Sequence, residues 1–165
     1  MSGQEVKTPY GCHFETERLY EATRRHGSLD ISSLCALPDN LLGAISDGVL
    51  PPSPVASWAF LDTETTGLAG GSGTYAFLIG VGRITAEGFR LRQFFMRDLA
   101  EEASLLHRLA EHLGEFETLV TYNGKRTISR YSKRAIEWHE PNLRLPGWSI
   151  SICSVAPAVS GSCAR

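Results

Sequence analysis

FLDTETTGL, residues 60–68, ends a run of apolar residues with two acids spaced two positions apart, Asp62 and Glu64. The run from Val55 is almost continuously apolar, which is typical of a strand that is buried on both faces. Side chains at i and i+2 of a strand point to the same face, so both acids are expected to project together near the strand's C-terminal end. Two neighbouring carboxylates repel each other, and burial disfavours their charged forms.

A divalent cation would remove both penalties at once. Carboxylate oxygens, waters and substrate phosphates are the ligands that suit Mg²⁺ or Mn²⁺. Two such ions can activate a water molecule and stabilise the leaving oxygen of a phosphodiester. The alternative is that Asp62 and Glu64 only cap the turn at Thr65 and Thr66, and the spacing by itself leaves both interpretations open.

The segments that follow predict an α/β architecture with a mixed sheet and flanking helices. Strands are expected at 74–84 and 88–98, joined by a hairpin turn that contains Gly88. Asp98 offers an N-cap for a helix, and a further strand follows at 117–125. The apolar face of that helix is expected to consist of Leu105, Leu106, Leu109 and Leu113.

The composition is that of an ordinary soluble globular protein, and 165 residues suit one domain. The formal net charge of -2 gives no global attraction to nucleic acid or to an anionic membrane. There is no signal-peptide pattern and no apolar run near the roughly 20 residues of a membrane span. The four cysteines are far apart and form no CxxC pair, which predicts free thiols and a cytoplasmic protein: Cys12, Cys35, Cys153 and Cys163.

FLDTETTGL is similar to the first motif of the DEDD exonucleases in the ribonuclease H-like superfamily. With FRLRQFFMRDLAEEASLLHRLAEHL, residues 89–113, and LVTYNGK, residues 119–125, it resembles the YprB-like ribonuclease H-like domain of bacteria. The resemblance implies a ribonuclease H-like mixed sheet, a 3′–5′ exonuclease activity on DNA or RNA, and bound Mg²⁺ or Mn²⁺. It also implies that Asp62 and Glu64 are the metal ligands and catalytic residues. Substrate contacts are expected from Thr65, Gly67, Asn123 and Lys125.

Three zones follow along the chain. Residues 1–54 are expected to form a helical or irregular extension, with one helix in the stretch that ends at Gly27 and a short one before the prolines near 51. Residues 55–125 are expected to form the ribonuclease H-like domain, incomplete at its C-terminal side. Residues 126–165 have no helical or strand period and are expected to be an irregular tail.

The resemblance stops after Lys125. The family places an Asp shortly after the Asn-Gly-Lys turn, but here that position is Ile128, and no Asp occurs after Asp98. Two of the four expected acids are therefore missing. The rival interpretation is a non-catalytic module that binds nucleic acid or a protein partner and keeps the fold without the chemistry.

A shift of the reading frame near Lys125 is our hypothesis for this divergence. Codons for the residues after Lys125 can be read in a second frame as peptides that resemble the family's continuation and restore an Asp. Residues 126–165 would then be an out-of-frame tail. Sequencing of the gene is expected to find those peptides encoded in the alternative frame, and a genomic sequence without them refutes the hypothesis.

Overall fold

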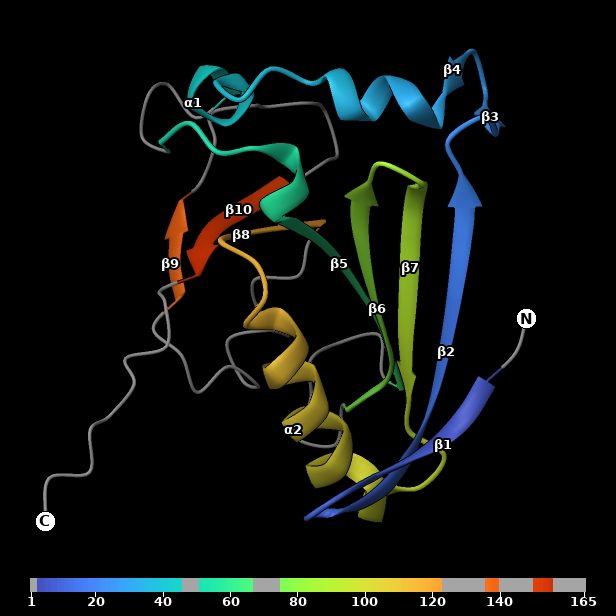
Figure 1. Ribbon diagram of the computed structural model, residues 1–165. Helices are drawn as coiled ribbons and strands as arrows, with labels where there is room; N and C mark the ends of the chain where they lie inside the picture. Colours follow the sequence, from blue (N-terminus) through green and yellow to red (C-terminus); the bar gives the residue numbers. More distant parts are fainter. Residues whose placement is uncertain (1–2, 46–50, 67–74, 123–135, 140–149, 156–165) are drawn as a thin grey trace, which may run out of the picture.

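The structure is a computed structural model that describes residues 3–45, 51–66, 75–122, 136–139 and 150–155. Within these residues, eight strands form one mixed sheet in the order β1-β2-β7-β6-β5-β8-β10-β9 (Figure 1). Strands β5 and β8 are parallel, and the other neighbours are antiparallel. The strands are β1 (Gly3–Thr8), β2 (Gly11–Glu21), β5 (Trp58–Thr65), β6 (Ala76–Thr85), β7 (Gly88–Phe95), β8 (Thr118–Tyr122), β9 (Ile136–His139) and β10 (Ile150–Val155).

Shorter elements surround the sheet. A two-stranded ribbon, β3 (Arg25–His26) and β4 (Leu29–Asp30), follows β2 and leads into the 3₁₀ turn η1 (Ile31–Ala36). The short helix α1 (Leu41–Ile45) is the helix predicted before the prolines, and η2 (Val55–Ser57) precedes β5. The turn η3 (Leu99–Glu101) opens the main helix, α2 (Glu102–Leu113).

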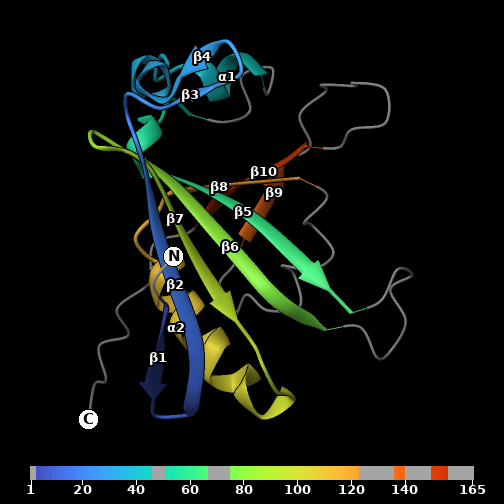
Figure 2. The ribbon, with the colours of Figure 1, turned by 90° about the vertical axis from the view of Figure 1, so that its right-hand side faces the viewer.

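The predicted order of strand, strand, strand, helix, strand is confirmed by β5, β6, β7, α2 and β8. Strands β2, β7, β6 and β5 lie side by side in one layer (Figure 2). The β6–β7 hairpin closes between Thr85 and Gly88. Gly88 has a φ of 138°, and a Cβ at this position would lie 2.1 Å from the carbonyl oxygen of Tyr20. Glycine is required there both by the backbone conformation and by the close approach of the neighbouring strand.

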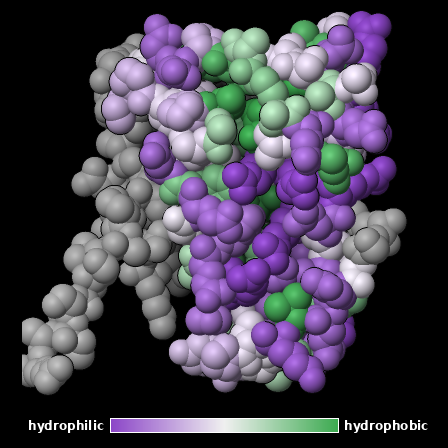
Figure 3. All heavy atoms as spheres, viewed as in Figure 1, coloured by the Kyte–Doolittle hydropathy of each residue, from purple (hydrophilic) through white to green (hydrophobic). Residues whose placement is uncertain are grey.

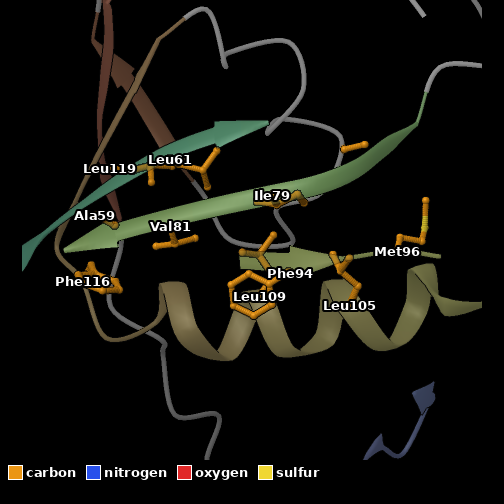
Figure 4. Packing of buried hydrophobic residues seen from close by; sticks show 11 residues of the cluster. Ala59, Leu61, Ile79, Val81, Phe94, Met96, Leu105, Leu109, Phe116 and Leu119 are labelled. Carbon is orange, nitrogen blue, oxygen red and sulfur yellow. The ribbon is translucent and has the colours of Figure 1, made fainter. Parts of the chain in front are cut away.

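Helix α2 covers one face of the sheet. Asp98 caps the turn η3 that leads into this helix, because the Asp98 side chain accepts a hydrogen bond from the Ala100 amide at 2.9 Å. Hydrophilic residues gather over the outer side of the helix (Figure 3). Of the predicted apolar face, Leu105 and Leu109 are fully buried, while Leu106 and Leu113 pack at the margin of the core. The core between helix and sheet includes Ala59, Leu61, Ile79, Val81, Phe94, Met96, Phe116 and Leu119 (Figure 4).

The N-terminal zone differs from the prediction. The stretch predicted as a helix ending at Gly27 is largely strand β2, which pairs with β7 from Phe14 opposite Phe95 to Glu21 opposite Gly88. The sequence predicts the helix over 15–27, and the prediction is wrong at 15–21, which belong to β2, and at Arg25–His26, which form β3. The physical reason is that β7 would otherwise leave its backbone groups unpaired, and pairing with a distant strand outweighs local helical preference.

A buried polar network fixes β2 against α2. The Nδ1 atom of His13 lies 2.8 Å from Ser104 Oγ, and its Nε2 atom lies 2.9 Å from a carboxylate oxygen of Glu15. Arg92 donates to the same carboxylate from its Nε at 2.7 Å, and Thr8 donates to Ser104 Oγ at 2.9 Å. This Ser–His–Glu chain has the connectivity of a nucleophile with its base. However, both His13 and Ser104 are 0% exposed, so no substrate reaches them and the network is structural.

The C-terminal zone is more regular than predicted. Strand β10 pairs with β8, Ile150 opposite Tyr122, and β9 pairs with β10. The prediction of an irregular tail is wrong for these two segments, because the free edge of β8 accepts any extended segment as a partner, regardless of its side-chain period. The other residues of the 126–165 tail lie outside the described residues.

Two further predictions from the composition concern membrane spans and cysteine thiols. In the part of the chain that the structure describes, no helix is long and apolar enough to cross a membrane. Cys12 and Cys35 are free thiols, as predicted. Cys153 and Cys163 are not among the residues whose side chains the structure describes.

One buried histidine couples the packing of α2 to pH. The ring of His112 lies between Phe94 and Phe116, with centroid distances of 5.9 and 5.4 Å, and its Nδ1 atom lies 3.0 Å from a carboxylate oxygen of Glu115. Burial lowers the pKa of His112 below its ordinary value of 6.5, and this outweighs the opposing effect of Glu115. The unfolded chain therefore binds this proton more readily than the folded one.

Replacement of His112 with Gln is expected to flatten the pH dependence of stability. The stabilisation from neutral His112 is present above pH 6.5 and is lost as the pH falls through the lower pKa of the folded state. Urea unfolding at a series of pH values between about 7 and 5 measures the difference. The matched control is His107→Gln on the same helix, because the His107 side chain is 35% exposed, pairs with Glu111 and contacts the exposed ring of Tyr10. An equal pH dependence in wild type and His112→Gln would contradict this assignment.

Candidate functional site

Asp62 and Glu64 lie together near the end of β5, as their spacing predicts. Both side chains are exposed, and both line one groove of about 540 Å³. Asp62 stands opposite Gly80 of β6, and Glu64 stands opposite Leu78. The intervening β5 positions point to the other face, where Leu61 packs in the core under α2. The acids therefore lie on the sheet face opposite α2.

The groove has a floor with few side chains and an apolar wall. Gly80 and Gly82 of β6 lie beside the acids, and Leu91 and Gln93 of β7 continue the floor away from β5. Phe60 and Phe89 close one end, with ring centroids 6.2 Å apart. The groove thus offers apolar surfaces on which flat rings can lie, next to two negative charges.

The two glycines have different surroundings. A Cβ on Gly82 would lie 2.2 Å from Cζ of Phe89, so the Phe89 ring already fills the space above this glycine. A Cβ on Gly80 would meet only Leu91 Cδ1, at 3.6 Å, and the backbone oxygen of Asp62 at 4.0 Å, which are ordinary contacts. Gly82 is therefore needed for packing, whereas Gly80 keeps the groove open beside Asp62.

The carboxylates of Asp62 and Glu64 have no cationic partner among the described residues. Two exposed carboxylates on one face, free of any ion pair, are a donor set that fits Mg²⁺ or Mn²⁺. Such ions take one or two protein carboxylates and complete their shells with water and substrate phosphate. The described residues contain no group of three or more His, Cys, Asp or Glu that could hold a metal by itself. Among the described residues, the pair thus offers two carboxylates, fewer than the three ligand groups of a metal site built by the protein alone.

The other predicted site residues are only partly placed. Thr65 ends β5, where the pairing with β6 shifts register between Glu64 and Thr65, and its side chain is half-buried. Gly67, Asn123 and Lys125 lie outside the described residues.

Sequence analysis missed the residues that form the groove itself. Gly80, Leu91 and Gln93 join Asp62 only through the β5–β6–β7 register. Thr121 also lines the groove, and its buried Oγ1 has no hydrogen-bond partner. One local pattern could have indicated this groove. In GVG, residues 80–82, two glycines at i and i+2 share a face of the strand and leave that part of β6 without side chains.

The comparisons with known proteins agree with the fold. Residues 59–145 match the family model of the RNase_H superfamily. The chain is also 38% identical over 66 residues to the uncharacterized protein YprB of Bacillus subtilis (strain 168). That match covers 40% of this chain and 16% of the relative's length. The predicted resemblance to a ribonuclease H-like domain of the YprB type is confirmed.

Gly82→Ala is expected to destabilise the fold, while Gly80→Ala is not. The new methyl group at residue 82 forces the Phe89 ring out of its place, which typically costs about 1–3 kcal/mol in a packed site. The methyl group at residue 80 makes ordinary contacts, so the free energy of unfolding should stay within about 0.5 kcal/mol of wild type. Urea unfolding of the two variants checks both values. Equal stabilities for the pair would show that Phe89 does not pack on Gly82.

Proposed function

This chain belongs to the RNase_H superfamily, and on that premise we propose that it carries part of a metal-dependent 3′–5′ exonuclease site for DNA or RNA. Domains of this superfamily generally use divalent metal ions and act on nucleic acid. The observation that supports the proposal is the pair of exposed carboxylates, Asp62 and Glu64, side by side in the groove and without a cationic partner among the residues that the structure describes. The chain matches only 16% of the relative's length, so the activity of the whole relative is not carried over.

In the proposed mechanism, Asp62 and Glu64 hold Mg²⁺ or Mn²⁺. The bound ions would lower the pKa of a water molecule and neutralise charge on a scissile phosphate. Gly80 leaves room for the substrate beside Asp62, and Phe60 gives an apolar wall that limits access of bulk water. Contacts to the substrate are proposed for Thr65, Gly67, Asn123 and Lys125.

The chain by itself is proposed to have little or no nuclease activity. Two carboxylates leave the metal ions under-coordinated by protein, and no Asp follows Asp98 to complete the set. A frame shift near Lys125 remains our hypothesis for that loss. The same observation favours a second candidate function, a non-catalytic module that binds nucleic acid or a protein partner through the same fold.

Asp62→Asn/Glu64→Gln is expected to abolish Mn²⁺ binding at the groove. The variant keeps the shape of both side chains and removes both charges, so isothermal titration with MnCl₂ should lose the binding seen in wild type. Asp39→Asn, which removes an exposed carboxylate elsewhere, is the matched control and should bind as wild type does. Undiminished Mn²⁺ binding in the double variant would overturn the ligand assignment.

A nuclease assay with Mn²⁺ on a single-stranded oligonucleotide measures the remaining activity. Little or no cleavage is expected from the wild-type chain. Robust cleavage that disappears in Asp62→Ala would contradict the low activity proposed for this chain and would remove the case for the non-catalytic module.

A further inference from the structure

Strand β2 presents a second, oppositely charged feature on the same sheet face as the acid pair. Arg18 and Tyr20 lie on β2, and Arg24 follows in the turn after it. The guanidinium carbon of Arg18 lies 4.8 Å from the centroid of the Tyr20 ring, and that of Arg24 lies 4.9 Å from it. Both arginines are exposed, and both guanidinium groups contact the same aromatic ring, which places them at most about 10 Å apart.

These two arginines differ from the rest in their charge environment. In residues 3–45, 51–66 and 75–122, Arg18 and Arg24 have no carboxylate within ion-pair distance. The remaining arginines of the described chain each pair with Asp or Glu: Arg25, Arg83, Arg90, Arg92, Arg97 and Arg108. The charge on Arg18 and Arg24 is thus available to an external anion.

The strand register connects the two features across the groove. Phe60 of β5 stands opposite Gly82, Gly82 opposite Leu91, and Leu91 opposite Arg18. Directly opposed residues of antiparallel strands share a face, so Arg18 lies on the face that carries Asp62. Three strand spacings of about 4.8 Å separate β5 from β2, which is roughly 14 Å. The groove reaches β7, the immediate neighbour of β2.

We propose that Arg18, Tyr20 and Arg24 form a phosphate-binding subsite, and that a single-stranded nucleic acid runs from there along the groove to Asp62 and Glu64. This rests on the proposed function, because it states how the substrate of that site lies. With a net charge of -2, the chain has no general attraction for a polyanion, so a local cationic anchor is needed. Without metal, the acid pair repels phosphate, and the anchor lies on β2, beyond the β7 side of the groove.

The surface between the two ends favours a single strand over a duplex. An aromatic row crosses the sheet, with Tyr20 and Phe89 ring centroids 6.3 Å apart and those of Phe89 and Phe60 6.2 Å apart. Phe60, Phe89 and Leu91 line the groove with apolar surface. Unpaired bases stack on such surfaces, whereas the bases of a duplex are already stacked on each other.

The test is binding of a fluorescein-labelled oligothymidine, followed by fluorescence anisotropy in EDTA. Arg18→Gln/Arg24→Gln should weaken binding about tenfold near 0.1 M salt, and the salt dependence of log K should become shallower by about 1.4 for two lost phosphate contacts. Arg25→Gln is the matched control, since it removes the same charge one residue from Arg24 at a side chain that pairs with Asp30 at 3.4 Å. It should bind within about twofold of wild type.

Further variants distinguish a failure of this phosphate-binding subsite from a failure of the proposed metal site. Asp62→Asn/Glu64→Gln should bind the oligonucleotide in EDTA at least as tightly as wild type, so failure of the metal site leaves this result intact. Tyr20→Phe should keep binding, while Tyr20→Ala should weaken it. Unchanged affinity in the Arg18→Gln/Arg24→Gln variant, an equal loss in Arg25→Gln, or equal affinity for a blunt duplex would each overturn the proposal.

Discussion

Strand β5 is the constraint on which the other parts of the structure depend. It is paired along both edges, antiparallel to β6 and parallel to β8, and so it sits inside the sheet. Its alternating side chains then face different environments: Ala59 and Leu61 are buried under α2, while Asp62 and Glu64 emerge on the other face. Displacing the register by one residue would bury the acids and expose the core, so the pleat of this strand fixes the site as firmly as it fixes the fold.

The two faces of the sheet accordingly serve different purposes. One face is closed by α2, and the buried network of His13, Glu15 and Ser104 extends that closure to β2. The buried carboxylate of Glu15 is tolerated because Arg92 and His13 satisfy its oxygens. The other face keeps a groove beside Gly80. Part of this second face is packed as well, because Trp58 and Ile84 are buried there in a cluster with Leu42, and the groove lies beside that cluster.

The charged side chains also differ between the groove face and the rest of the described chain. Across this face, acids on β5 and arginines near β2, neither of them ion-paired within the described residues, lie at opposite sides of an apolar strip. Elsewhere in the described chain, arginines are matched by carboxylates, as for Arg90 with Glu17. A surface on which opposite charges are kept apart, each without its own partner, is suited to a ligand that carries phosphates and needs metal at one end.

Several features could be predicted from the sequence because their physics is local. The spacing of Asp62 and Glu64 fixes their common face, the backbone freedom of Gly88 marks the hairpin, and Asp98 caps the turn before the helix through its own side chain. The order of strands and helix follows from such periods. Nothing in these patterns needs knowledge of which strands become neighbours.

The other features depend on pairings between distant residues. The stretch 15–27 has a helical spacing of apolar residues, yet residues 15–21 belong to β2 because β7 offers them a ladder of hydrogen bonds. The burial of His13 against Ser104, the bare strip at Gly80, and the place of Arg18 in line with Phe60 all follow from register between strands far apart in the sequence. The sequence by itself determined the chemistry available at each position. Only the tertiary structure decided which of those groups share a face, because strand register is set by the packing of the whole sheet and not by any one segment.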